Sequence, residues 1–198
     1  MITPGFTPSS EDIKISETEI EGLLIFEKKL YQDRRGWFQE SFRTEDIAKA
    51  WGVTDLVIKQ SSFTYNLPKT LRGLHGEPQY KLVTSITGQC FIAIADIRVG
   101  SSTFGKVLTF EFDYSDINTP RKTLAISPGL ANSILVTGNE AVFYHYGVSD
   151  TFKFESEKRA IRWNDPDLSI DWPIKDPILS KADQNHPFLR EVFPDKFS

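Results

Sequence analysis

Short apolar runs, many of them alternating with polar residues, recur along the chain from residue 57 to residue 146. Runs of about four to eight residues that are rich in β-branched and aromatic side chains are typical of β-strands. The pattern predicts strands at residues 57–65, 71–75, 81–86, 91–97, 107–112, 123–126, 133–136 and 141–146. Glycine-containing turn signals separate several of these runs. Many short strands at this spacing predict an all-β sandwich or barrel and argue against alternating β-α-β units.

The two ends of the chain differ from this β-rich middle. Residues 1–20 are predicted to form an N-terminal leader, because their first part is polar and interrupted by proline and glycine. Residues 44–51 have the apolar spacing of a short helix, with Thr44 as a candidate N-cap, and we expect no other substantial helix. After residue 154 the chain is rich in proline and tryptophan. We expect this tail to wrap the barrel, with its tryptophans as packing anchors.

Composition limits the class of protein. The 198 residues fit one domain, which we assign to residues 21–198, and 39% hydrophobic residues provide enough apolar side chains for a packed core. A net charge of -4 and a pI near 5.5 argue against a nucleic-acid partner, although a local basic pocket for a phosphorylated small molecule is compatible with them. The single cysteine, Cys90, excludes an internal disulfide and any cysteine-based zinc cage, and we expect a buried, inert thiol.

The expected location of the protein follows from what the chain does not contain. No apolar run is long enough for a transmembrane helix, and the N-terminus lacks the basic start and apolar middle of a signal peptide. We therefore expect a cytoplasmic protein without a membrane partner.

Ionisable side chains within or beside strand-like runs are the candidates for chemistry. Arg72, His75 and Lys81 are costly to bury without partners, so we expect them to face a ligand. His75 has apolar or small neighbours and suits a neutral base that works near neutral pH. A core histidine bonded to a backbone carbonyl is an equally good interpretation of the residues alone. Arg34 and Arg35 beside a turn glycine fit either a solvated loop or an anion clamp.

Several separate motifs occur in a fixed order along roughly residues 21–187: Asp33 to Glu40, Gln60, Leu71 to His75, Lys81 to Val83, Pro128-Gly129 with Ala131, Trp163 to Pro166, Trp172-Pro173, and Leu179-Ser180 with Asp183. In these motifs the chain resembles the dTDP-4-dehydrorhamnose 3,5-epimerase family. That family consists of cupin-like jelly rolls that epimerise nucleotide-linked 4-keto sugars. The resemblance implies that the predicted barrel is a cupin-like jelly roll and that the protein is an isomerase of deoxysugar or surface-glycan biosynthesis.

The resemblance also implies roles for individual residues. His75 matches the general base of the family, Asp183 the carboxylate that pairs with it, Tyr146 the general acid, and Lys81 the cation near the sugar carbonyl. The chemistry needs such a set, because the hydrogens at C3 and C5 lie next to a C4 ketone and their removal as protons leaves an enolate. Tyr144, two residues away on the same strand face, is a second candidate for the acid.

The predicted substrate-binding residues include both matches to the family and departures from it. Residues that match positions holding the nucleotide-diphosphate sugar are Arg35, Glu40, Gln60 and Arg72. Asn132 stands where a second pocket histidine is common, and Phe152 stands where a second tyrosine is usual. His75 is followed by Gly76 and Glu77 instead of the usual aromatic residue and glutamine. We therefore expect epimerase chemistry on a different nucleotide sugar, or inversion at one centre only.

The resemblance implies a homodimer, whereas the residues themselves indicate that no cofactor is needed. Metal-dependent cupins use a His-x-His pair, and the residue two positions after His75 is Glu77, so we expect no metal site. Proton transfer at an acidified C–H bond requires no nicotinamide, and the chain contains no dinucleotide fingerprint. His145 is expected on the strand face opposite Tyr144 and Tyr146, and His186 at the surface. Two alternatives remain: a keto-sugar isomerase on the same scaffold, and a non-catalytic cupin that binds a sugar nucleotide.

Overall fold

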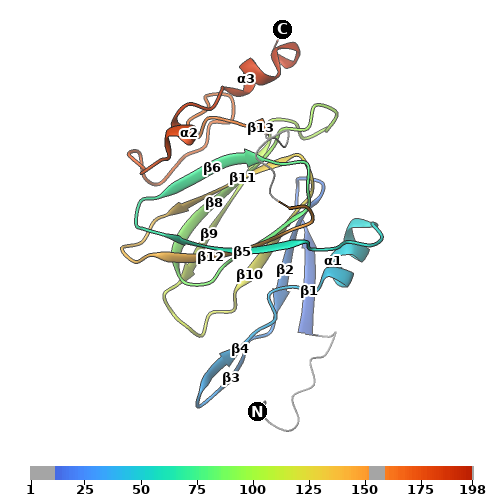
Figure 1. Ribbon diagram of the computed structural model, residues 1–198, viewed down its shortest axis with the longest axis vertical. Coiled ribbons are helices and arrows are strands. Elements are labelled where there is room, and N and C mark those ends of the chain that lie inside the picture. Colours follow the sequence, from blue (N-terminus) through green and yellow to red (C-terminus); the bar gives the residue numbers. More distant parts are fainter. Residues whose placement is uncertain (1–11, 152–158, 198) are drawn as a thin grey trace.

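Two antiparallel β-sheets face each other in the computed structural model, which describes residues 12–151 and 159–197 (Figure 1). The first sheet contains, in spatial order, β1 (Ile13–Glu17), β2 (Leu23–Lys28), β10 (Lys122–Ile126), β7 (Lys81–Ser85), β12 (Val142–Val148) and β5 (Gln60–Asn66). The second contains β13 (Arg159–Ala160), β6 (Leu71–Gly76), β11 (Leu130–Val136), β8 (Gly88–Asp96) and β9 (Val107–Tyr114). A separate hairpin is formed by β3 (Tyr31–Asp33) and β4 (Gly36–Phe38). The predicted all-β fold is confirmed.

The alternation of apolar and polar residues explains how the sheets face each other. On β9 the side chains of Leu108, Phe110 and Phe112 pack against the core, whereas Thr109 and Glu111 between them are exposed. This arrangement follows from the two-residue period of a strand. The core that fills the space between the sheets combines residues of both: Leu23, Val83, Leu124, Ile126, Val142 and Tyr144 from the first sheet with Ile92, Ile94 and Ile134 from the second.

The C-terminal tail covers the outer face of the second sheet, as the sequence predicted (Figure 1). It contributes the helices α2 (Lys181–Gln184) and α3 (Leu189–Val192) and a 3₁₀ helix, η2 (Pro194–Lys196). Trp172 packs on Phe91 with ring centroids 5.5 Å apart, and its indole nitrogen donates to the carbonyl oxygen of Trp163. Both faces of β11 are therefore covered, and all of its residues are buried. The interpretation of Trp172 as a packing anchor is confirmed.

The helix α1 (Thr44–Trp51) packs on the outer face of the first sheet and is the only one of more than four residues in the described part of the chain. Its apolar side chain Ile47 is fully buried there. The N-cap is Arg43, and its side chain makes no capping hydrogen bond, so the prediction of Thr44 as the N-cap was wrong by one residue. Gly52 ends the helix with a φ of 66°, a conformation that favours glycine.

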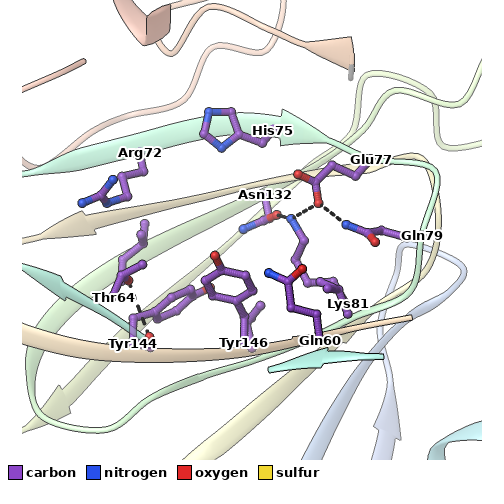
Figure 2. Close-up of a pocket in the computed structure, with 13 residues that line it drawn as sticks. Gln60, Thr64, Arg72, His75, Glu77, Gln79, Lys81, Asn132, Tyr144 and Tyr146 are labelled. Carbon is purple, nitrogen blue, oxygen red and sulfur yellow. Dashed lines mark hydrogen bonds and ion pairs between the residues drawn. The ribbon is translucent and has the colours of Figure 1, made fainter. Parts of the chain in front are cut away.

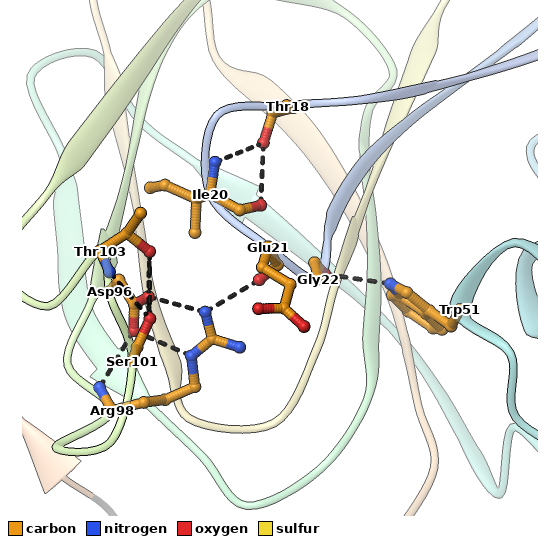
Figure 3. Close-up of polar contacts among 9 residues, drawn as sticks. All are labelled: Thr18, Ile20, Glu21, Gly22, Trp51, Asp96, Arg98, Ser101 and Thr103. Carbon is orange, nitrogen blue, oxygen red and sulfur yellow. Dashed lines mark hydrogen bonds and ion pairs between the residues drawn. The ribbon is translucent and has the colours of Figure 1, made fainter.

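Buried polar contacts tie the connection after β8 to the turn between β1 and β2 (Figure 3). Asp96 is fully buried and accepts hydrogen bonds from the guanidinium of Arg98 and from the hydroxyls of Ser101 and Thr103. Arg98 also donates to the carbonyl oxygen of Glu21 at 2.9 Å. These bonds outweigh the effect of burial and hold the pKa of Asp96 at about 2. The network closes the end of the sandwich remote from the N-terminal hairpin β3-β4.

Strand pairing extends towards the N-terminus, into residues assigned to the leader from sequence. Residues 13–17 form β1 and pair with β2 at the edge of the first sheet. The predicted strand at residues 57–65 is shorter at its start, since β5 begins at Gln60. Within the described ranges, no helix combines the length and apolar character that crossing a membrane requires.

Candidate active site

A cavity of about 310 Å³ lies between the sheets and is lined by side chains from five strands and one loop (Figure 2). Its lining residues are Gln60, Thr64, Arg72, His75, Glu77, Gln79, Lys81, Val83, Asn132, Ile134, Tyr144, Tyr146 and Val148. The lining is polar at its centre and contains acids, bases and amides in contact with one another. A concave site with a few converging polar groups is the usual form of a small-molecule site.

An irregularity in β6 brings Arg72 and His75 to the same cavity. Residues three apart on a regular strand point to opposite faces. Here Gly73 has a φ of 129°, and the pairing of β6 with β11 shifts register between Asn132 and Ile134. A side chain at position 73 would meet the Cβ of Ser133 at 2.6 Å. The local backbone therefore requires glycine, and it turns both functional side chains towards the cavity.

His75 is held by a carboxylate from the tail. Its Nε2 lies 2.7 Å from Oδ1 of Asp183, which is 4% exposed. Burial by itself raises the pKa of Asp183, but hydrogen bonds from His75 and Ser180 outweigh it and hold the pKa at about 2. The carboxylate is therefore ionised at neutral pH and accepts the Nε2–H. In Figure 2 the other ring nitrogen, Nδ1, points into the cavity, where it is available to accept a proton.

A helix cap fixes the position of Asp183. Ser180, the N-cap of α2, accepts a hydrogen bond from the backbone N–H of Asp183 and donates its hydroxyl to Oδ2 of the same residue at 2.8 Å. One carboxylate oxygen is thus bonded to Ser180 and the other to His75. Long-range packing of the tail brings this pair together across 108 positions in the sequence.

Lys81 lies in a buried polar cluster on the floor of the cavity (Figure 2). Its ammonium group is 2.9 Å from Oε2 of Glu77 and donates to Oδ1 of Asn132 at 2.8 Å. Gln79 donates to the same Glu77 oxygen at 2.8 Å. Sequence reasoning noted Glu77 only as a departure and did not identify Glu77 or Gln79 as cavity residues. The two-residue intervals from His75 to Glu77 and from Glu77 to Gln79 were the available signal.

The two tyrosines of β12 line the cavity, as their spacing predicts, and His145 between them lies on the opposite face. Tyr144 is 4% exposed, and its buried hydroxyl has no hydrogen-bond partner among the described residues. Burial raises the pKa of Tyr144 well above its ordinary value. Tyr146 is less buried than Tyr144. His145 bonds to Ser61.

Three of the predicted binding residues, Gln60, Arg72 and Asn132, line the cavity. Arg35 and Glu40 do not line it within one chain. Arg35 lies in the β3-β4 hairpin, which projects from the sandwich, and it forms a salt bridge with Asp33 (Figure 1). Glu40 accepts hydrogen bonds from Arg43 and lies 3.3 Å from the ammonium of the buried Lys28. Phe152 lies outside the described residues.

His186 is a residue that sequence reasoning placed wrongly at the surface. Its side chain is only 20% exposed, and its Nε2 lies 3.3 Å from Oδ1 of Asp183. The ring meets that of His75 edge to face, with centroids 5.8 Å apart. The three-residue spacing of Asp183 and His186 was the signal that could have identified the contact, although His186 lies two residues beyond the end of α2.

The family model for dTDP-4-dehydrorhamnose 3,5-epimerase matches residues 17–191, which is most of the chain. The chain belongs to the dTDP-4-dehydrorhamnose 3,5-epimerase family. A relative of that name from Shigella flexneri is 34% identical over 177 residues, which cover 87% of this chain and 94% of the relative. The predicted family and its isomerase class are confirmed.

Two solved structures of epimerases extend the similarity to the whole fold. A 4-keto-6-deoxy sugar epimerase from Streptomyces spheroides has a TM-score of 0.84 and is 26% identical, and the match covers 97% of this chain and 95% of that one. A dTDP-6-deoxy-D-glucose-3,5-epimerase from Legionella pneumophila, solved with dTDP-4-keto-L-rhamnose, has a TM-score of 0.82 at 32% identity, with 92% and 96% covered. The cupin-like architecture of this epimerase family member is thereby confirmed.

Proposed function

We propose that the protein epimerises a nucleotide-linked 4-keto-6-deoxy sugar by removing a proton at C3, at C5 or at both and returning it to the opposite face. The observation that carries the proposal is the orientation of His75. Asp183 holds its Nε2, and Nδ1 points into a cavity that also contains two tyrosines and a lysine. The comparisons with epimerases of such sugars support the same chemistry.

In the first step, Nδ1 of His75 takes the proton from the carbon next to the ketone. The ionised Asp183 accepts the Nε2–H, so it fixes the tautomer with a free Nδ1 and stabilises the imidazolium that forms. Proton transfer by a positioned group of this kind accelerates a reaction about 10²–10⁴-fold.

Lys81 supports the enolate that this step creates. Lys81 as a whole is only 9% exposed, and its ammonium group is held in place by Glu77 and Asn132. The positive charge therefore acts in a site that excludes most water. A developing negative charge on the ketone oxygen is stabilised more strongly there than in bulk water.

Tyr146 then returns a proton from the opposite side. Its position on β12 places it in the wall across from His75, as Figure 2 shows. Tyr144 stands beside it on the same face, and its hydroxyl is buried more deeply. We assign the acid to Tyr146, and Tyr144 to a hydrogen bond with a sugar hydroxyl. A buried hydroxyl without a partner costs about 1–3 kcal/mol, and a bound sugar removes that cost.

Gln60, Arg72 and Asn132 supply contacts for the nucleotide sugar from within the chain. In our proposal, Arg35 reaches the site from the β3-β4 hairpin of a second copy in a homodimer, and Glu40 reaches it from the segment that follows this hairpin. Neither residue lines the cavity of its own chain, and the hairpin projects from the sandwich (Figure 1); both observations support this arrangement. The flat guanidinium of Arg35 suits a diphosphate.

The test is proton–deuterium exchange in D₂O with a panel of nucleotide-linked 4-keto-6-deoxy sugars, followed by NMR at C3 and C5. We expect deuterium at one or both carbons and a product of inverted configuration. Exchange with movement of the carbonyl to another carbon would instead identify a keto-sugar isomerase. Binding of the sugar nucleotides without exchange at either carbon would refute the proposal and identify a binding protein.

A further inference from the structure

Two histidines share one carboxylate oxygen at the base of the active site. Oδ1 of Asp183 is 2.7 Å from Nε2 of His75 and 3.3 Å from Nε2 of His186. The ligand atoms of these three residues all lie within 4.8 Å of one another. Two imidazole nitrogens and a carboxylate oxygen that converge on one point are a ligand set typical of catalytic zinc sites and of other transition-metal sites.

The second histidine packs edge to face on His75 but makes no ring hydrogen bond to a described residue. Its Nε2 is buried and lies 3.3 Å from Oδ1 of Asp183. A buried polar nitrogen without a hydrogen bond is costly and calls for an explanation. A metal ion bound between the three side chains would provide the missing partner.

The surroundings of the three residues fix them and give access. Ser180 donates to Oδ2 of Asp183, and Arg162 donates to the carbonyl oxygen of His186 at 2.8 Å. Outer contacts of this kind orient ligands in metal sites. All three ligands also line a second cavity of about 470 Å³, which shares Arg72 and His75 with the proposed substrate cavity and has room for water at an open coordination position.

Two arginines limit the strength of such a site. Arg72 and Arg159 line the same second cavity, and their positive charges oppose a cation. Only one carboxylate offsets them at the site. The site should therefore bind a transition metal reversibly, through nitrogen ligation, and should not retain Mg²⁺, which prefers an all-oxygen shell with several waters.

We propose that His75, Asp183 and His186 form a Zn²⁺ site that switches off the epimerase. Binding of Zn²⁺ to Nε2 of His75 would displace the proton on that nitrogen and leave the neutral ring protonated at Nδ1. A protonated Nδ1 has no lone pair with which to abstract the sugar proton. The switch rests on the proposed function, whereas the metal site itself does not.

The metal site is tested by titrating the purified full chain with ZnCl₂ in competition with a chromophoric chelator. We expect one Zn²⁺ per chain, no displacement by excess Mg²⁺, and at least about tenfold weaker binding for His186→Gln, since losing a directly bound ligand should cost no less than losing an outer contact. His145→Gln is the matched control, because His145 lies on the opposite face of β12 and should leave Zn²⁺ binding unchanged.

Crystals soaked in ZnCl₂ give a readout that does not depend on how a variant folds. An anomalous zinc peak between the three residues would support the site. Equal Zn²⁺ affinity of the wild type and His186→Gln, or a zinc peak only elsewhere, would overturn it.

The switch is tested by deuterium exchange with and without Zn²⁺. We expect Zn²⁺ to stop exchange in the wild type, a chelator to restore it, and the inhibiting concentration to rise at least about tenfold in His186→Gln. Zinc bound at the three residues without loss of exchange would refute the switch. A protein that shows no exchange even without zinc would refute the proposed function, while the titration would still decide the metal site.

Discussion

Single residues in the cavity are positioned by one another. Glu77 and Asn132 hold the ammonium of Lys81, and Asp183 holds His75. Such preorganised groups do not need to reorient when charge develops in a transition state. The Glu77–Lys81 ion pair reduces the net positive charge that faces a bound sugar.

Replacement of His75 tests the base directly. His75→Asn should lower the rate of deuterium exchange by about 10²–10⁴-fold, because the side-chain amide cannot accept a proton from carbon at neutral pH. Binding of the sugar nucleotide, measured by calorimetry, should change little by comparison. His145→Gln is the control and should exchange at the wild-type rate, since that ring lies outside the cavity. Full exchange by His75→Asn would remove this residue from its role.

Asp96 gives a prediction for stability against pH. Its pKa in the folded protein is about 2, below the usual 3.8, so its ionised form stabilises the fold. This contribution is complete above about pH 5, amounts to about 2 kcal/mol, and is lost as the pH falls towards 2, with about half gone at pH 3.

Other carboxylates titrate in the same range, so the comparison is with Asp96→Asn. Urea unfolding at pH 7 and pH 3 should show a loss of stability in the wild type that exceeds the loss in the variant by about 1 kcal/mol. Identical losses in the two proteins would show that Asp96 makes no such contribution.

Among the elements, β6 carries the decisive irregularity. Gly73 has a φ of 129°, and an added Cβ would meet β11 at less than 3 Å from the Cβ of Ser133 and the carbonyl oxygen of Asn132. The strand cannot relax away, because β11 pairs with it on one side and β13 on the other. The geometry of β6 therefore fixes the position of His75 relative to Lys81.

Gly73→Ala should accordingly destabilise the protein by about 1–3 kcal/mol through overpacking and backbone strain. It should also slow exchange in the fraction that remains folded, because His75 is displaced. Gly100→Ala is the control, since its added Cβ meets nothing within 4 Å and its φ is not positive. Thermal unfolding gives the melting temperatures of the two variants. Equal melting temperatures would contradict the expected destabilisation by Gly73→Ala.

For the whole molecule, the arrangement of the hairpin raises the question of which copy completes the site. Arg35 lies in the turn between β3 and β4, on a hairpin that projects from the sandwich (Figure 1), and it does not line the cavity of its own chain. A two-fold dimer places equivalent segments of the two chains in equivalent positions. If the hairpin acts in the other chain, then each site needs His75 from one copy and Arg35 from its partner.

Mixing two inactive variants decides this point. Arg35→Ala and His75→Asn, unfolded together and refolded as a mixture, should recover about a quarter of the wild-type exchange rate, because half the dimers are mixed and each contains one intact site. The two variants refolded separately and then combined provide the control. No recovery in the refolded mixture would mean that Arg35 acts within its own chain, and full exchange by Arg35→Ala alone would mean that Arg35 has no part in the site.

The sequence by itself determined the secondary-structure class and the chemistry. Alternating apolar residues predict strands because a strand has a period of two, and that local rule also placed Tyr144 and Tyr146 on one face with His145 on the other. The motifs identified the family, and the proline- and tryptophan-rich tail was correctly expected to cover the barrel.

Only the tertiary structure decided which distant residues meet. The family resemblance implied the pairing of Asp183 with His75, but the contact of His186 with both depends on how the tail packs on the second sheet, which no local sequence pattern determines. The shared face of Arg72 and His75 depends on a register shift against β11, which breaks the two-residue rule used for the prediction. Local propensities therefore determined the elements, and long-range packing determined the site.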